Sequence, residues 1–199
     1  LCRSTDAGRS WAQLGKSSIG RATVQAIALA PSSNDSRVIV IGTEEHGLWR
    51  STDGGRRWAA AENLPTQSIN AVAMSPNFAD DQLVVAGTGD AGVLISCDGG
   101  LTWIKKAVGA DVGAVLSVAV MADGSATTIW AGTYETGLYR SDDAGANWEP
   151  ANNGITSQNW VALALSPNFG KDRTMFTGGT GTGVFRSTDG GESWMPVGE

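Results

Sequence analysis

Short apolar runs, separated by polar turns, recur along the whole chain. Residues 69–108 show the pattern best, where INAVAMSPNFADD, QLVVAGTGDAG, VLISCDGG and LTWIKKAV follow one another. Apolar runs of about four to eight residues, bounded by Gly, Pro, Asn and Asp turns, are typical of β-strands. This segment therefore predicts four strands. No window shows the sustained 3.6-residue apolar period of a helix, so no helix of consequence is expected.

The four-strand pattern repeats with a nearly constant period. A motif of the form Ser-x-Asp-x-Gly-x-x-Trp begins at Ser4, Ser51, Ser96, Ser141 and Ser187, at spacings of 47, 45, 45 and 46 residues. Four antiparallel strands in about 45 residues are typical of one blade of a β-propeller. We therefore predict a single all-β propeller segment over residues 1–199, with a half blade at 1–15 and complete blades at 23–62, 67–108, 112–153 and 158–197.

The repeated motif resembles the Asp-box, also called the bacterial neuraminidase repeat. Propellers with this box occur in sialidases, xyloglucan-cleaving glycosidases, sortilin-type receptors and photosystem II assembly factors. The string SPNFADDQLVVAGTGDAGVLISCDGGLTW is similar to the bacterial group of these propellers. The resemblance covers essentially the whole chain and implies that each box is the hairpin between the third and fourth strands of a blade. It implies a fold rather than one function, because the family contains both enzymes and binding proteins.

The box residues have a structural explanation. An Asp can accept backbone N–H bonds across its own turn, a Gly can adopt positive φ, and a Trp can bury a large ring against the blade. A calcium loop would need alternating oxygen ligands that these runs lack. We therefore interpret the box residues as turn-forming and packing residues. They are Asp6, Asp53, Asp98, Asp143 and Asp189; Gly8, Gly55, Gly100, Gly145 and Gly191; and Trp11, Trp58, Trp103, Trp148 and Trp194.

An arginine precedes four of the five boxes. These residues are Arg3, Arg50, Arg140 and Arg186, with Ile95 in the remaining copy. A cluster of arginines could bind a carboxylate, as the sialidase triad does. Because these four are one position repeated from blade to blade, we favour a structural role in which each lies over a neighbouring strand.

Composition narrows the classes of partner. The net charge of -6 argues against nucleic acid, which would require a basic face. No apolar run approaches the roughly 18 residues needed to span a bilayer. The two cysteines, Cys2 and Cys97, lie in separate repeats, so no disulfide between them is expected. The family resemblance implies an extracytoplasmic setting, whether secreted, periplasmic or lumenal.

The differences between blades indicate where a binding site would lie. In propellers, the loops between the second and third strands share one face with the connectors between blades, and the Asp-boxes lie on the other face. These loops read GTEEHG, GTGDAG, GTYETG and GTGTG. They bring to one rim the candidate binding residues Glu44, Glu45, His46, Asp90, Tyr134 and Glu135. The connectors add Asn63, Gln67, Asp111, Asn152, Asn153 and Gln158. The alternative is that these are ordinary solvated turns.

The rim could also form an active site. A glycosidase needs two carboxylates, and Glu44, Asp90 and Glu135 are candidates on neighbouring blades. Tyr134 and Glu135 could form a sialidase-like nucleophile pair, but no arginine occurs in these loops. His46 is the only histidine, which is too little for the usual zinc site, and any Ser-His-Asp set would have to use it; an exposed turn residue is the favoured interpretation. We therefore assign no catalytic residue, metal or cofactor.

Two tryptophans lie outside the boxes. Trp130 and Trp160 fall on predicted strands, so core packing is expected; exposure on the rim would instead indicate a platform for stacking sugars.

The half blade affects the functional prediction. An open array would leave a sheet face exposed, so we expect these residues to be part of a larger propeller or to close through another chain. The favoured function is a non-enzymatic protein-interaction or assembly scaffold that binds a partner through its loop rim. The alternative is a fragment of a secreted glycoside hydrolase, sialidase-like or xyloglucanase-like, with catalytic residues partly outside this chain. A carbohydrate ligand is therefore possible.

Overall fold

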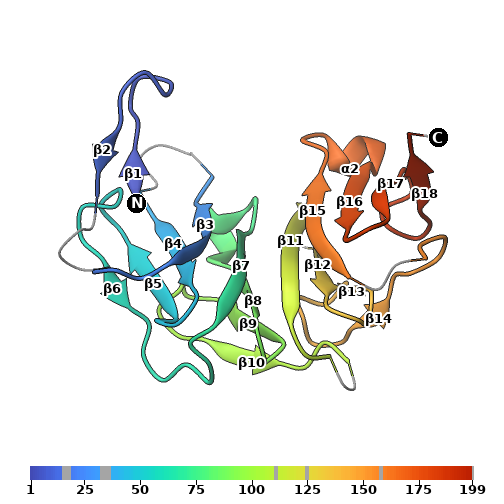
Figure 1. Ribbon diagram of the computed structural model, residues 1–199, viewed down its shortest axis with the longest axis horizontal. Helices are drawn as coiled ribbons and strands as arrows, with labels where there is room; N and C mark the ends of the chain where they lie inside the picture. Colours follow the sequence, from blue (N-terminus) through green and yellow to red (C-terminus); the bar gives the residue numbers. More distant parts are fainter. Residues whose placement is uncertain (15–18, 32–36, 110–111, 124–125, 157–158, 199) are drawn as a thin grey trace.

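The computed structural model describes residues 1–14, 19–31, 37–109, 112–123, 126–156 and 159–198. It confirms the predicted fold class: a two-stranded hairpin is followed by four antiparallel four-stranded sheets, the blades of an all-β propeller (Figure 1). Within each blade, the strands lie side by side in chain order. Consecutive antiparallel strands need only short turns, which the Gly-rich loops of the sequence supply.

The partial blade at the N-terminus consists of β1 (Cys2–Arg3) and β2 (Ala12–Gln13). The first blade consists of β3 (Val24–Leu29), β4 (Ile39–Thr43), β5 (Leu48–Ser51) and β6 (Ala59–Ala60). The second consists of β7 (Ile69–Met74), β8 (Val84–Thr88), β9 (Val93–Ser96) and β10 (Ile104–Lys106). The third consists of β11 (Val115–Asp123), β12 (Ala126–Thr133), β13 (Leu138–Ser141) and β14 (Glu149–Pro150). The fourth consists of β15 (Trp160–Leu165), β16 (Met175–Gly179), β17 (Gly183–Ser187) and β18 (Met195–Val197).

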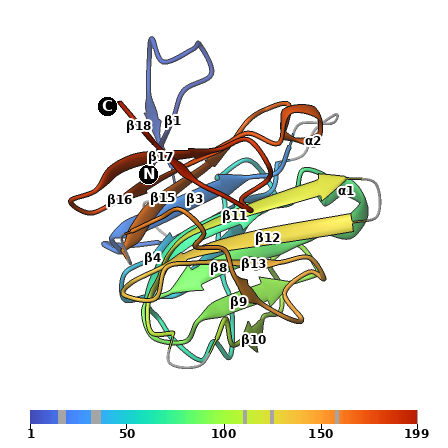
Figure 2. The same cartoon turned by 90° about the vertical axis from the view of Figure 1, so that its right-hand side faces the viewer.

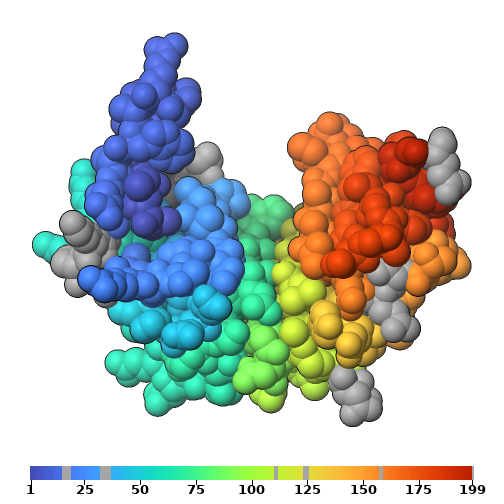
Figure 3. All heavy atoms as spheres, viewed as in Figure 1, coloured from blue at the N-terminus to red at the C-terminus, as the bar shows by residue number. Residues whose placement is uncertain are grey.

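The blades form an open arc. The partial blade and the first blade lie at one end, the fourth blade lies at the other, and a wide notch separates the two ends (Figures 1 and 3). The first strands of neighbouring blades contact one another along the inside of the arc. A hydrogen bond from the Asn70 side-chain amide to the Val115 carbonyl, 3.1 Å long, joins two of these strands.

Two short helices lie between strands. The segments α1 (Phe78–Asp81) and α2 (Phe169–Asp172) each form a single helical turn in the Ser-Pro-Asn-Phe string that follows the first strand of the blade. The turn is built locally, because Ser75 donates to the Asp81 carboxylate, and Asp81 accepts the N–H of Leu83 at 2.9 Å. One turn is too short to produce an apolar period, so the pattern could not reveal it.

Each blade has two faces, which we name by chain order. The forward face points toward the next blade, and the backward face points toward the preceding one. Apolar residues from the forward face of one blade and the backward face of the next form a continuous cluster at each junction, as Val40 and Leu48 do with Val72 and Met74. The core of this protein is therefore a series of blade-to-blade interfaces rather than one central cluster.

The box tryptophans belong to these interfaces. Trp58 and Trp194 are buried, at 8% and 2% exposure, as predicted. Trp103 and Trp148 are only half-buried against the preceding blade. Trp11 is 66% exposed, because no described element lies on the backward side of the partial blade.

Candidate functional site

The rim loops share one frame. In three blades a Thr at the end of the second strand closes the loop by donating both its N–H and its hydroxyl to a Gly carbonyl four residues later. For Thr43 and Gly47 these distances are 3.0 and 2.8 Å. The same pair of bonds joins Thr88 to Gly92 and Thr133 to Gly137. Because the frame is fixed by backbone acceptors, the residues between Thr and Gly are free to vary in chemistry.

Backbone hydrogen bonds attach these loops to the connectors between blades. The N–H of Gly47 donates to the carbonyl of Gln67 at 2.9 Å, and the N–H of Gly89 donates to that of Ser68 at 3.0 Å. The N–H of Tyr134 donates to the carbonyl of Ala114 at 2.9 Å. Loops and connectors therefore lie on one face of the arc. We call this face the rim, formed by residues 44–47, 89–92, 134–137 and 180–182 with the connectors that adjoin them.

The structure places the six candidate residues on the rim as separate, exposed side chains. Tyr134 is 49% exposed, and the other five are also exposed. No hydrogen bond or ion pair connects any two of the six, all of which lie in the described part of the chain. The rim is therefore a row of acidic and polar groups on short turns. The six are Glu44, Glu45, His46, Asp90, Tyr134 and Glu135.

Glu135 has an unusual backbone conformation. Its φ is +72°, a left-handed value that costs a residue with a side chain about 1 kcal/mol or more. Its N–H donates a 2.7 Å hydrogen bond to the Asn159 side-chain oxygen, which comes from the connector into the fourth blade. The equivalent position in the fourth blade is Gly181, with φ of +77°. Sequence reasoning missed this contact, although the Gly at the matching position of the repeat was a usable signal.

The connector residues fall into several groups. Asn63, Gln67 and Asn153 are exposed. Asn152 is half-buried, and its side-chain oxygen accepts the N–H of Leu138 at 2.7 Å, so it holds the third-blade loop in place. Asp111 and Gln158 lie outside the described residues.

On the opposite face, the box aspartates are occupied within their own turns. In the first blade, Asp53 accepts the N–H groups of Arg56 and Arg57, both at 2.9 Å, and the hydroxyl of Ser51. The Ser51 hydroxyl oxygen also accepts the N–H of Gly55 at 2.8 Å. The same Ser–Asp–Gly contacts recur in the other boxes. The box glycines all have φ between +86° and +92°: Gly8, Gly55, Gly100, Gly145 and Gly191.

These hydrogen bonds hold the pKa of the box carboxylates low. The N–H of Asn147, followed by its side-chain amide, lowers the pKa of Asp143 from 3.8 to about 2. For Asp98, partial burial raises the pKa, but the bonds that Thr102 and Ser96 donate outweigh it and lower the pKa to about 2. A carboxylate with so low a pKa is ionised at neutral pH and is a poor general acid.

The arginines before the boxes connect neighbouring blades. The Arg50 Nε–H donates to the Gly99 carbonyl at 2.6 Å, and the Arg3 guanidinium donates to the Gly54 carbonyl at 3.1 Å. Each acceptor lies in the Asp-box of the next blade, not on a neighbouring strand as the sequence suggested. Where Ile95 replaces arginine, its Cδ1 atom lies against Gly145 of the next box.

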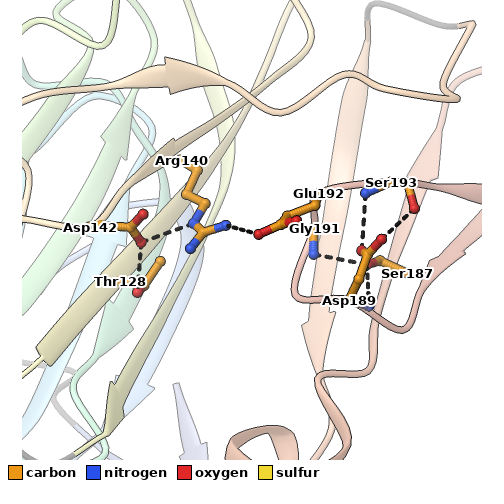
Figure 4. A network of polar contacts seen from close by, with 8 residues as sticks. All are labelled: Thr128, Arg140, Asp142, Ser187, Asp189, Gly191, Glu192 and Ser193. Carbon is orange, nitrogen blue, oxygen red and sulfur yellow. Dashed lines mark hydrogen bonds and ion pairs between the residues drawn. The ribbon is translucent and has the colours of Figure 1, made fainter.

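Arg140 differs from Arg3 and Arg50 because it contacts carboxylates in place of a backbone carbonyl. Its Nε donates to the Asp142 carboxylate at 2.9 Å, and Nη1 lies 3.9 Å from the Glu192 carboxylate in the fourth-blade box (Figure 4). Between these two blades lies a polar cavity of about 570 Å³, lined in part by Asp142, Glu149 and Glu192. Sequence reasoning did not identify it, because its walls come from the Asp-box turns of two blades together with the outer strand of the third blade.

Several other predicted features can be placed. Trp130 and Trp160 are 1% and 0% exposed, which confirms core packing and leaves neither ring available for stacking sugars. Cys2 and Cys97 are exposed and unpaired. Among the described residues, no group of three His, Cys, Asp or Glu side chains is placed to hold a metal ion. Neither of the short helices described could cross a membrane.

Comparisons with known proteins agree with the fold. No protein-family model matches the chain. A curated relative, the xyloglucanase Xgh74A of Acetivibrio thermocellus, is 38% identical over 72 residues. That match covers 33% of this chain and 8% of the enzyme, so the chain matches only a small part of its curated relative.

Two solved structures illustrate the range of similar propellers. An ancestral GH74 enzyme superposes with a TM-score of 0.69 at 20% identity, over 89% of this chain and 24% of the enzyme. YCF48 bound to a D1 peptide superposes with a TM-score of 0.63 at 16% identity, over 98% of this chain and 60% of that protein. At these identities the structural similarity establishes the fold only. One of the two proteins is described as an enzyme and the other as a protein with a bound peptide. The chain is thus a segment of the propeller fold seen in both.

Proposed function

We propose that this propeller segment is a non-enzymatic interaction module that holds a protein partner on its rim. The observation that carries the proposal is the form of the rim loops. In three of the four blades the loop is a tight turn closed by a Thr–Gly pair, and the acidic side chains of these loops project into solvent without contacting one another. A surface of this kind suits the broad face of another protein, whereas a small substrate requires a concave site with convergent polar groups.

The chemistry of the rim indicates the kind of partner. Glu44, Glu45, Asp90 and Glu135 give it a negative character, and the net charge of the chain is -6. A partner with lysines and arginines on its contact surface would be attracted and oriented by this charge. The similar structure of YCF48 contains a bound peptide, which supports a protein ligand for a propeller of this shape. We propose an extracytoplasmic setting for this interaction, as the family resemblance implies.

The second candidate is a fragment of a glycoside hydrolase. It is favoured by the identity with a xyloglucanase and by the similarity to a GH74 enzyme. If the protein is an enzyme, this is the class that the comparisons support. Two carboxylates would have to face each other across a bound sugar, at a separation of about 5–9.5 Å. The rim loops are short and contain no arginine, which is why we rank this function second.

The test uses the intact protein and two sets of variants. The rim variant carries Glu45→Gln, Asp90→Asn and Glu135→Gln, and the control carries Asp142→Asn, Glu149→Gln and Glu192→Gln on the box side. Each is immobilised and exposed to the envelope and secreted fractions of the source, and retained proteins are identified by mass spectrometry. We expect a partner at stoichiometric amounts on wild type and control but not on the rim variant. Release of oligosaccharides from xyloglucan, with no protein retained, would overturn the proposal.

A further inference from the structure

The rim loop of the third blade, residues 133–137, is held by side chains as well as by its backbone frame. The Glu135 N–H donates to the Asn159 side-chain oxygen at 2.7 Å. The Leu138 N–H donates to the Asn152 side-chain oxygen at the same distance of 2.7 Å. Figure 2 shows this loop, which follows β12, at the same end of the molecule as the loop that follows β16 and opposite α1 and α2. Because these contacts fix the loop before a ligand arrives, binding to it costs little ordering.

This loop presents the ring of Tyr134 to solvent. The Tyr134 N–H donates to the Ala114 carbonyl at 2.9 Å, while the side chain is 49% exposed and makes no hydrogen bond or ring contact with a described residue. The other tyrosine, Tyr139, packs against the core cluster between the second and third blades. Core packing therefore explains Tyr139 but not Tyr134. A tyrosine offers a large, rigid contact surface with few torsions to order, which makes it frequent in binding surfaces.

The next residue, Glu135, supplies an exposed carboxylate from a strained backbone. Its φ of +72° is unfavourable for a residue with a side chain, and Gly181 occupies the matching position of the fourth blade. The Glu135 carboxylate forms no hydrogen bond or ion pair with a described residue. Backbone strain of this kind persists where surrounding contacts impose it, and it is frequent at ligand-binding sites. The loop therefore combines a fixed conformation, a free aromatic ring and a free carboxylate.

We propose that this loop is the anchor of the rim and binds one arginine side chain of the protein partner, with the guanidinium over the Tyr134 ring and hydrogen-bonded to the Glu135 carboxylate. This inference rests on the proposed function and names the residues and the chemical group that carry its recognition. The face of an aromatic ring and a carboxylate both attract a cation. Arginine suits this pair better than lysine, because its planar guanidinium stacks on a ring while its N–H groups donate to a carboxylate.

The charges along the rim favour a cation over a sugar at this ring. The loop of the second blade carries the exposed Asp90, and that of the first blade carries Glu44 and Glu45, whereas residues 180–182 of the fourth blade bear no charge. A basic partner that crosses the arc would therefore meet carboxylates on one side of Tyr134 and none on the other, which sets its direction. A sugar would gain contact with the ring but nothing from these charges.

The anchor can be tested with short peptides, before any natural partner is used. The isotope-labelled protein is titrated with Ac-Gly-Arg-Gly-amide, with its lysine analogue and with its citrulline analogue, which is planar but neutral, and binding is followed by NMR. We expect the arginine peptide to shift the amide signals of Tyr134 and Glu135, the lysine peptide to shift them less, and the citrulline peptide to leave them unchanged. Tyr134→Phe keeps the ring and should keep this affinity, whereas Tyr134→Leu should weaken it by about threefold or more. Glu192→Gln, on the box side, is the control.

The partner captured on the rim provides the second measurement. Tyr134→Leu should weaken its binding by about tenfold or more, as expected for the central residue of an interface, and Tyr134→Phe should not. Equal binding of the partner by these two variants would overturn the anchor and leave the proposed function intact. Arginine-selective shifts with no partner retained from any fraction would count against the proposed function and support the cation site.

The peptide titrations can also overturn the anchor by themselves. Shifts at Tyr134 and Glu135 that are equal for the arginine and citrulline peptides, or absent for both, would show that the loop does not recognise a cation. Xyloglucan oligosaccharides are titrated in parallel. Larger shifts at Tyr134 with these sugars than with the arginine peptide would assign the ring to a carbohydrate.

Discussion

The Nε–H of Arg50 donates a 2.6 Å hydrogen bond to the carbonyl oxygen of Gly99, which lies 49 residues further along the chain. The donor is on the third strand of one blade, and the acceptor is in the Asp-box turn of the next. The box therefore stabilises its own hairpin and also supplies a backbone carbonyl that accepts a hydrogen bond from the preceding blade. Arg3 and Gly54 repeat the relationship at the preceding junction.

This contact predicts a difference between two arginines at the same repeat position. Arg50→Ala leaves a carbonyl without its charged donor, so the free energy of unfolding should fall by about 1–3 kcal/mol. Arg186→Ala in the same chain removes no hydrogen bond to a described residue, and its effect should stay within about 0.5 kcal/mol. Urea unfolding of both variants measures the difference. Equal losses would show that the cross-blade bond contributes nothing.

The residue between the Asp and the Gly of each box has a left-handed backbone, so glycine at this position should stabilise the folded chain. Ala144 has φ of +55° at a position where three of the other boxes have Gly54, Gly99 and Gly190, so Ala144→Gly should raise the free energy of unfolding by about 0.5 kcal/mol.

The reverse substitution in another box should be destabilising. Gly99→Ala should lower the free energy of unfolding by about 1–2 kcal/mol, because its φ is +73° and the new Cβ would lie 2.9 Å from the Gln82 side chain. Gly113→Ala is the control, since nothing lies within 4 Å of that position and its φ is not positive. Thermal unfolding of the three variants and the wild type measures whether each change raises or lowers the stability. A loss of stability in Ala144→Gly would contradict the proposed backbone strain.

The low pKa values of the box aspartates predict acid sensitivity. A carboxyl whose pKa is about 2 in the folded chain, against 3.8 ordinarily, favours the folded state when ionised. This stabilisation is complete above about pH 5 and is lost as the pH falls through 4 toward 2. The urea midpoint should therefore drop across this window.

Asp98→Asn isolates the effect of one box. The variant should be less stable at neutral pH and should lose less stability on acidification, because the neutral amide does not titrate. Asp90→Asn, a rim residue whose side chain makes no hydrogen bond, should behave like wild type. Parallel pH profiles for wild type and Asp98→Asn would contradict the assignment.

The backbone of Glu135 predicts opposite effects on stability and on binding. Glu135→Gly should raise the free energy of unfolding by about 0.5–1 kcal/mol, because glycine adopts φ of +72° without strain. The same change removes a rim carboxylate and should weaken partner binding. Glu135→Gln separates the effects, since it keeps the strain and removes only the charge. A loss of binding in the Gly variant alone would point to backbone geometry rather than charge.

The blades could be predicted from the sequence because each is a local object repeated several times. Strand runs, turn residues and the motif of Asp53 and Trp58 all recur at one spacing. What the sequence could not reveal depends on contacts between repeats. The acceptor of the Arg50 hydrogen bond lies in another blade. The exposure of Trp11 depends on whether another element packs on the backward side of the partial blade. The loop positions of the rim could be predicted, and Gly181 at the matching repeat position was a signal for the left-handed backbone of Glu135, but the hydrogen bond that Asn159 accepts from Glu135 could not be predicted.

The most direct test of the proposed interaction rim is to determine where on this protein the partner binds. The captured complex would be cross-linked through carboxylates, and the linked peptides identified by mass spectrometry. The account predicts links from Glu45, Asp90 and Glu135 to lysines of the partner, and few from Asp142, Glu149 and Glu192 on the box side. Links confined to the box side would contradict it and would place the binding surface on the opposite face of the arc.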